Sequence, residues 1–177
     1  MNRSIHLAEL LGFAATSLLG TLLHFAYDLF GASPWVAPFS AVNESTWEHM
    51  KLLFFPMFLF ALAEWFFFRD RADFFCIKLR GTLLGLILIP VLFYTYNGVI
   101  GKSPDWINIA IFFIAAAAAY LSETRRFMQE STPCPSSGAA LTALILLAGL
   151  FVLFTFVTPH IGIFLDPVTG GYGIPAN

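Results

Sequence analysis

Five apolar stretches, each long enough to cross a lipid bilayer, constrain this sequence more than any other feature. The hydrocarbon core of a bilayer is spanned by a helix of about 20 apolar residues, and backbone groups in lipid must be paired within the helix. We therefore predict an all-α integral membrane protein, a bundle of five transmembrane helices in a single transmembrane domain over residues 1–177. The expected helices cover approximately residues 7–30, 45–68, 81–100, 106–121 and 139–158, followed by a tail over 159–177.

The composition supports a membrane protein and excludes several other classes. Of the 177 residues, 58% are hydrophobic and only 11% are charged. Soluble domains carry about 25% charged residues, and disordered chains lack this apolar content. Nine Lys and Arg residues against eleven Asp and Glu residues, a net charge of −2, leave no basic face for nucleic acid. The partners we expect are therefore membrane lipid and a lipid-like or small-molecule substrate.

The positions of the basic residues predict the orientation of the chain. Cytoplasmic loops of membrane proteins are enriched in Lys and Arg. Seven basic residues fall on the side of the N-terminus and only two on the other: Arg3, Arg69, Arg71, Lys78, Arg80, Arg125 and Arg126 against Lys51 and Lys102. We expect a multi-pass protein of the plasma (inner) membrane with its N-terminus in the cytoplasm and its C-terminus outside.

The two cysteines carry no recognisable motif. Cys76 and Cys134 form no CxxC pair and have no metal-ligand spacing around them. The expected topology places both near the cytoplasmic side, where disulfides are rare. We therefore expect two unpaired cysteines.

Polar residues that are energetically unfavourable in a membrane helix are concentrated near one side of the membrane, which is the outer side in this orientation. Three of the four histidines are among them. The set is His24, Asp28, Asn43, Glu44, Ser45, Glu48, His49, Tyr94, Tyr96, Asn97, Asp105, His160 and Asp166.

His24 and Asp28 lie near the end of the first stretch with a spacing of four residues. Side chains at this spacing share a helix face and can touch. A charged group inside a membrane helix costs about 2.5–3.5 kcal/mol on insertion scales, so such groups usually face a cavity or a partner. The pair is either a local hydrogen bond or part of a functional site.

The second stretch begins with two overlapping patterns. Ser45 and Glu48 fit a capping box, which explains both residues structurally. The capping box leaves Glu44 and His49 unexplained. A helix that begins earlier, capped by Asn43, would instead place Glu44 and Glu48 on one face and His49 on the adjacent face.

The tail after the last stretch has the composition of a shaped loop. Pro159 and Pro167 end helices, and the Gly170-Gly171 pair permits unusual backbone angles. The tail either packs over the helix ends or forms a lid that brings His160 and Asp166 to an outer pocket.

Imidazole and carboxylate groups on one face suit a divalent metal, either zinc or an iron or manganese ion. Glu48 or Glu44 would act as general base beside it. No HExxH, GxSxG or P-loop sequence is present. The predicted metal ligands are His24, Asp28, His49 and His160, and the other polar residues of the site are Asn43, Tyr96, Asn97, Asp105 and Asp166.

Two motifs, VNES-x-WEH-x-K over residues 42–51 and DP-x-TG-x-YG over residues 166–173, carry a resemblance. They resemble a family of small multi-pass bacterial membrane proteins that is known as a domain of unknown function. The resemblance implies five membrane helices and assigns no activity. The chain is more weakly similar to seven-helix membrane hydrolases of the alkaline ceramidase type, which hold zinc with histidines at helix ends. It has fewer helices than those enzymes and lacks their HxxxH motif.

Three functions remain open at this point. The first is a metal-dependent membrane enzyme that acts on a lipid or another amphiphile. The second is a small transporter or ion-binding protein with the polar residues as an outer vestibule. Glu64 would then continue a path inward, unless it only reaches the interface beside Arg69. The third is a structural or accessory membrane protein.

Overall fold

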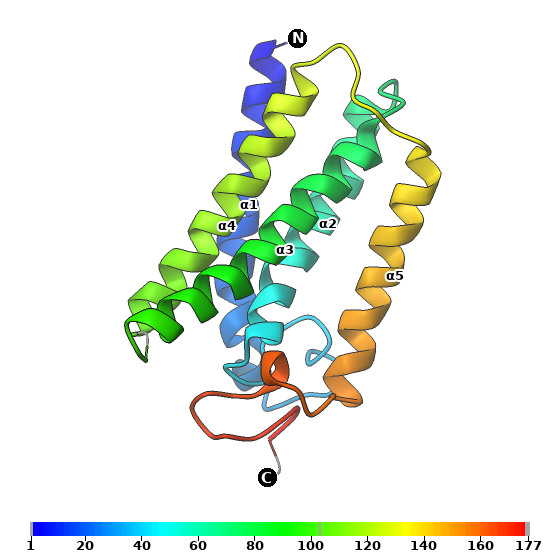
Figure 1. Ribbon diagram of the computed structural model, residues 1–177. Coiled ribbons are helices and arrows are strands. Elements are labelled where there is room, and N and C mark those ends of the chain that lie inside the picture. Colours follow the sequence, from blue (N-terminus) through cyan, green and yellow to red (C-terminus); the bar gives the residue numbers. More distant parts are fainter. Residues whose placement is uncertain (1, 103, 176–177) are drawn as a thin grey trace.

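The computed structural model describes residues 2–102 and 104–175, and this part of the chain is helical without any strand. All five long helices have the length and hydropathy to span a membrane, which confirms the predicted fold class. The elements in chain order are α1 (Asn2–Leu29), α2 (Thr46–Phe68), α3 (Phe74–Val99), α4 (Asp105–Phe127), α5 (Ser137–Phe156) and the short 3-10 helix η1 (Gly162–Phe164) (Figure 1).

Three helices extend further than the apolar stretches. The first helix begins at Asn2 instead of residue 7, the third at Phe74 instead of residue 81, and the fourth continues to Phe127 instead of ending at residue 121. The added turns contain charged residues that are buried inside the bundle, including Lys78 and Glu123. A hydropathy scale assigns such residues to loops, because it contains no information on charges that are paired inside the protein.

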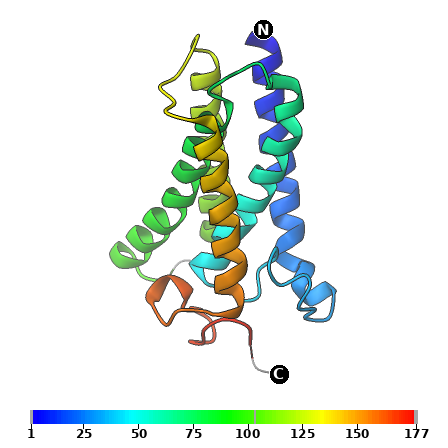
Figure 2. The same ribbon diagram turned by 90° about the vertical axis from the view of Figure 1, so that its right-hand side faces the viewer.

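Helices α1 to α4 form the core of the bundle, and α5 lies outside it. Each of α1 and α3 packs against both α2 and α4, whereas α5 packs mainly against α3 (Figures 1 and 2). At the α3–α4 interface, a Cβ added to Gly85 would lie 3.3 Å from the Cβ of Ala119 and 3.4 Å from the carbonyl oxygen of Ala115. Small residues thus let these two helices approach closely, as they commonly do in membranes.

The C-terminal tail covers one end of the bundle, where α1 ends and α2 begins (Figure 1). Leu165 and Tyr172 form an isolated antiparallel bridge, and Asn43 Nδ2 donates to the carbonyl oxygen of Gly173 at 2.8 Å. The buried ring of Phe164 lies 4.7 Å from that of Trp47. These contacts hold the tail against the helix ends, and we call this the tail end of the bundle.

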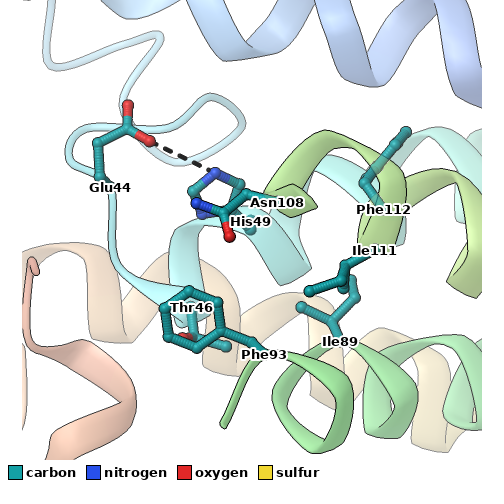
Figure 3. Close-up of a pocket in the computed structure, with 8 residues that line it drawn as sticks. All are labelled: Glu44, Thr46, His49, Ile89, Phe93, Asn108, Ile111 and Phe112. Atoms are coloured by element: carbon teal, nitrogen blue, oxygen red, sulfur yellow. Dashed lines mark ion pairs between the residues drawn. The ribbon is translucent and has the colours of Figure 1, made fainter. Parts of the chain in front are cut away.

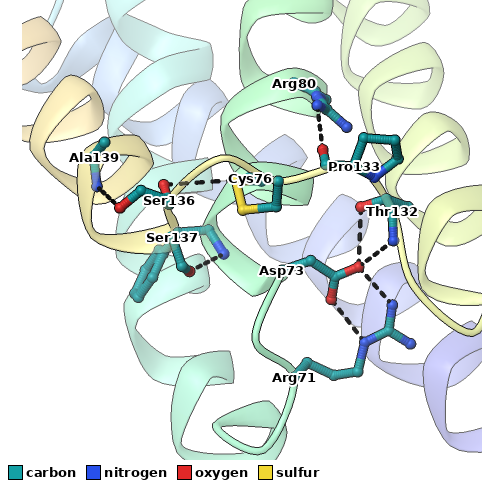
Figure 4. Close-up of a disulfide and its surroundings, with 11 residues drawn as sticks. Arg71, Asp73, Cys76, Arg80, Thr132, Pro133, Ser136, Ser137 and Ala139 are labelled. Carbon is teal, nitrogen blue, oxygen red and sulfur yellow. Dashed lines mark hydrogen bonds and ion pairs between the residues drawn. A yellow bond between two sulfur atoms is a disulfide. The ribbon is translucent and has the colours of Figure 1, made fainter.

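The opposite end of the bundle holds a disulfide between Cys76 and Cys134 (Figure 4). The Cα atoms of the two residues are 5.8 Å apart, although 58 positions separate them in the sequence. The expectation of two unpaired cysteines is wrong. Because α3 begins at Phe74, Cys76 sits in its first turn, beside the loop that joins α4 to α5. We call this the arginine-rich end.

A hydrogen-bonded network beside the disulfide holds that loop in place. Arg71 donates to both carboxylate oxygens of Asp73, at 2.9 and 3.0 Å. Asp73 also accepts bonds from the backbone and the side chain of Thr132, at 2.7 and 3.0 Å (Figure 4). Burial raises the pKa of Asp73, but these four bonds and the Arg71 charge outweigh it and lower the pKa to about 2.

Candidate metal centre

Helix α2 begins with half of the predicted capping box. Ser45 is the N-cap, and its hydroxyl accepts a bond of 3.4 Å from the amide of Glu48. The amide of Ser45 donates to Asn43 Oδ1 at 2.9 Å, so the Glu48 carboxylate does not return to it. The helix starts at Thr46, which excludes the alternative start after Asn43.

The carboxylate of Glu48 is used inside the bundle. It lies 2.6 Å from Lys51 Nζ and accepts a bond of 2.9 Å from the amide of Val42. Lys51, whose side chain is fully buried, also donates to the carbonyl oxygen of Ala37 and to Thr155 Oγ1, each at 2.9 Å. The pair of Glu48 and Lys51 thus links the segment between α1 and α2 to the end of α5.

Glu44, held in the turn before α2, faces two histidines from different helices. Its Oε1 lies 3.7 Å from Nε2 of His24 in α1, and its Oε2 lies 3.5 Å from Nε2 of His49 in α2. The imidazole rings are 5.7 Å apart between centroids. One ligand atom from each of the three residues lies within 4.8 Å of the other two. The structure thus brings together two of the predicted ligands and one of the two predicted bases.

The geometry of His49 prepares it to bind a metal. Its Nδ1 lies 2.9 Å from the carbonyl oxygen of Ser45, which can only accept, so Nδ1 carries the proton and Nε2 is left with a lone pair. Two ligand atoms on a tetrahedral zinc with bonds of about 2.1 Å are separated by about 3.4 Å. The two His–Glu separations are close to this value, so the residues present fit a divalent metal.

The three residues line a cavity of about 520 Å³ among α1, α2, α3, α4 and the tail. Toward the tail end, α3 and α4 lean away from α1 and α2, which leaves room for it (Figure 1). Most of its wall is apolar, with Leu52, Phe93 and Phe112 near the histidines, and Pro167 and Val168 of the tail complete it. Figure 3 shows Glu44 and His49 at an adjoining recess, opposite the ring of Phe93.

The remaining predicted ligands lie outside this cluster. Asp28 is exposed, and within the described part of the chain no hydrogen bond or ion pair joins it to His24, which faces Glu44 instead. His160 is exposed, with its ring 4.7 Å from that of Tyr172. The buried Asp166 accepts bonds from Val168 N and Thr169 Oγ1, at 2.9 and 2.6 Å, and so shapes the tail.

The other predicted polar residues divide between the cavity and its surroundings. Asn97 lines the cavity, whereas Asn43 holds the tail and the half-buried Tyr96 is not in the lining. Asp105 begins α4, and its side chain lies outside the part that the structure describes. Sequence reasoning missed Asn108, which lines the cavity from α4. The sequence signal that could have indicated it is a single amide residue within an apolar stretch.

A family model covers nearly the whole chain. The match spans residues 4–174, and the family is described as a family of unknown function, DUF6512. The chain belongs to the DUF6512 family. Neither the curated proteins nor the solved structures contain a match to it. Membership in DUF6512 agrees with the expected resemblance to a family without an assigned activity, so the function has to be argued from the site itself.

Proposed function

We propose that this protein is a metal-dependent membrane enzyme that acts on a lipid or another amphiphile. The observation that supports this best is the convergence of His24, Glu44 and His49 on the wall of a largely apolar cavity. Two imidazoles and one carboxylate are a ligand set that zinc uses in catalytic sites, where three protein ligands leave a position for water. Zinc is therefore the metal we place first, ahead of iron or manganese.

Each part of the site has a role in this proposal. A bound divalent metal supplies an acidic water, whose pKa falls to about 7 in zinc enzymes. The apolar wall formed by Leu52, Phe112 and their neighbours accommodates an alkyl chain. Lys102, which lines the same cavity, provides a positive charge for the polar end of the ligand. Glu48 has no part in this scheme, because its carboxylate is paired with Lys51.

Metal content of the detergent-purified protein tests the proposal. We expect about one transition-metal ion per chain, which is lost when His24→Ala and His49→Ala are combined. His160→Ala is the matched control, since this histidine lies outside the cluster, and it should retain the metal. A protein without metal after purification in the absence of chelators would overturn the proposal, as would a double variant that still binds it.

A transporter is the second candidate, and one observation favours it. Ionisable residues cluster at the arginine-rich end as well as near the tail end, and α1 contributes the buried Glu9 to one cluster and the half-buried His24 to the other. Between them, Thr16 Oγ1 lies 2.7 Å from Tyr120 Oη, and both residues are buried. Metal uptake into liposomes that contain the purified protein would favour transport over catalysis.

A further inference from the structure

Four charged side chains from four different helices meet near the arginine-rich end. They are Glu9 of α1, Glu64 of α2, Lys78 of α3 and Glu123 of α4, and each is at most 4% exposed. None of them belongs to the cluster around Glu44. Of the two alternatives for Glu64, the one that places it at the interface beside Arg69 is excluded, because Glu64 is buried and paired with Lys78.

Lys78 stands at the centre of this cluster, which we call the Lys78 cluster. Its Nζ lies 2.8 Å from Glu9 Oε1 and 2.7 Å from Glu123 Oε2, and it is also paired with Glu64 Oε2. The ammonium group of Lys78 donates hydrogen bonds to Glu9 and Glu123, whereas its contact with Glu64 is an ion pair. Four carboxylate oxygens, Glu9 Oε2, Glu123 Oε1 and both oxygens of Glu64, are buried without a hydrogen-bond partner in the described structure.

The charges of the Lys78 cluster do not balance when every group is ionised. One ammonium and three carboxylates leave two negative charges in a site that is almost completely buried. An uncompensated charge in such a site is strongly unfavourable, and a carboxylate avoids the cost by binding a proton. Two protons would make the cluster neutral, with one ionised carboxylate opposite Lys78.

Within the described residues, Lys78 is the only cation that forms an ion pair with the three carboxylates. The rings of Tyr120, Phe74 and Phe127 lie 5.8, 5.8 and 5.2 Å from Lys78 Nζ. Arg71 packs on the ring of Phe127 as well, but its guanidinium is bound to Asp73. The aromatic rings act on Lys78 alone, so they stabilise its charge and not the excess negative charge.

The arrangement of the three carboxyl groups also allows the two bound protons to take part in hydrogen bonds. Glu9, Glu64 and Glu123 all contact the same Lys78 Nζ, so their carboxyl groups lie close to one another. Two ionised carboxylates cannot bond to each other, because neither has a proton to donate. A protonated carboxyl group in this cluster would donate to a neighbouring carboxylate and so satisfy oxygens that otherwise have no partner.

We propose that Glu9, Glu64 and Glu123 around Lys78 form a buried proton-binding site that holds two exchangeable protons. This site is separate from the candidate metal centre, and the proposal does not depend on a metal. Its ligand is the proton, taken up from the side of the membrane on which the arginine-rich end lies.

Infrared spectroscopy of the purified protein tests this proposal directly, through the carbonyl stretch of protonated carboxylic acids and its shift in deuterated water. At neutral pH we expect the wild type to show two such groups per chain that belong to the Lys78 cluster. Each single variant, Glu9→Gln, Glu64→Gln or Glu123→Gln, leaves two carboxylates and one ammonium, so one group should remain. A variant with two of these changes should show none.

Glu130→Gln is the matched control, because Glu130 is exposed and lies outside the Lys78 cluster, and it should leave the signal unchanged. Glutamine has nearly the shape of a protonated glutamate, which favours folding of the variants. A wild-type spectrum without protonated carboxylic acids would overturn the proposal on its own, even if a variant did not fold. A signal that none of the three substitutions reduces would overturn it equally.

Discussion

Asp73 shows how one carboxylate can hold a loop at the end of a membrane bundle. It lies between α2 and α3 and accepts bonds from Arg71 on its own segment and from Thr132 on the distant loop after α4. Hydrogen bonds to the ionised form are what lower its pKa. The link between the two loops therefore exists only while Asp73 carries its charge.

We predict that this link makes stability depend on pH. The pKa of Asp73 falls from 3.8 to about 2 on folding, so its contribution is complete above about pH 4 and is lost as the pH falls toward 2. Asp73→Asn should lower the thermal unfolding temperature in detergent at neutral pH and make little difference near pH 2. Asp70→Asn, at an exposed neighbour, should change neither value. A deficit of Asp73→Asn that persists at pH 2 would contradict this account.

The residues of the two polar clusters were not equally predictable from the sequence. His24, Glu44 and His49 could be identified because they lie near the ends of apolar stretches, on the same side of the membrane. Polar residues in such positions suggest a shared site. Lys78 was placed in a loop, which hid its position at the same depth as Glu9 and Glu123. An ionisable residue in a membrane helix requires a partner, so the isolated carboxylates were the signal that could have led to it.

At the scale of helices, α1 approaches its neighbours through glycine. A Cβ added to Gly20 would lie 2.6 Å from Phe112 Cζ and 2.8 Å from the backbone oxygen of Leu52. The backbone of α2 cannot turn aside as a side chain can, so the added methyl group would push α1 away from α2. Gly20 also lines the cavity, which couples this packing to the candidate metal centre.

We therefore predict that Gly20→Ala destabilises the protein and weakens metal binding. Overpacking of a well-packed interface costs about 1–3 kcal/mol, which should appear as a lower thermal unfolding temperature. Gly149→Ala in α5 is the matched control, because nothing lies within 4 Å of the added Cβ, and it should leave stability unchanged or slightly raised. Equal effects of the two substitutions would show that α1 and α2 do not pack as closely as the structure indicates.

The existence and order of the helices followed from apolar length, whereas their ends did not. The apolar stretches could not show that α3 begins at Phe74. Cys76 and Lys78 are assigned to a loop by hydropathy as long as their partners are unknown. Capping chemistry was more informative for α2, because it offered Ser45 and Asn43 as N-caps and the structure has Ser45. Local hydrogen bonds can be predicted from neighbouring residues, but pairing across the bundle cannot.

For the whole molecule, the disulfide and the basic residues indicate opposite sides of the membrane for the arginine-rich end. Lys51 and Lys78 are buried in helices, so neither contributes to the charge of a loop. The remaining basic residues still lie six to one in favour of the arginine-rich end, which predicts that this end faces the cytoplasm. Cys76 and Cys134 lie at the same end, yet thiols in the cytoplasm are normally kept reduced.

We predict that the basic residues decide the orientation. In a bacterial host, a reporter fused to the N-terminus should be cytoplasmic and one fused to the C-terminus should be outside. Thiol trapping in intact cells should then find Cys76 and Cys134 reduced, and oxidation after purification should stabilise the fold by roughly 2–4 kcal/mol. Reporters in the opposite arrangement, together with a disulfide in cells, would contradict the prediction. The Lys78 cluster would then take its protons from outside the cell.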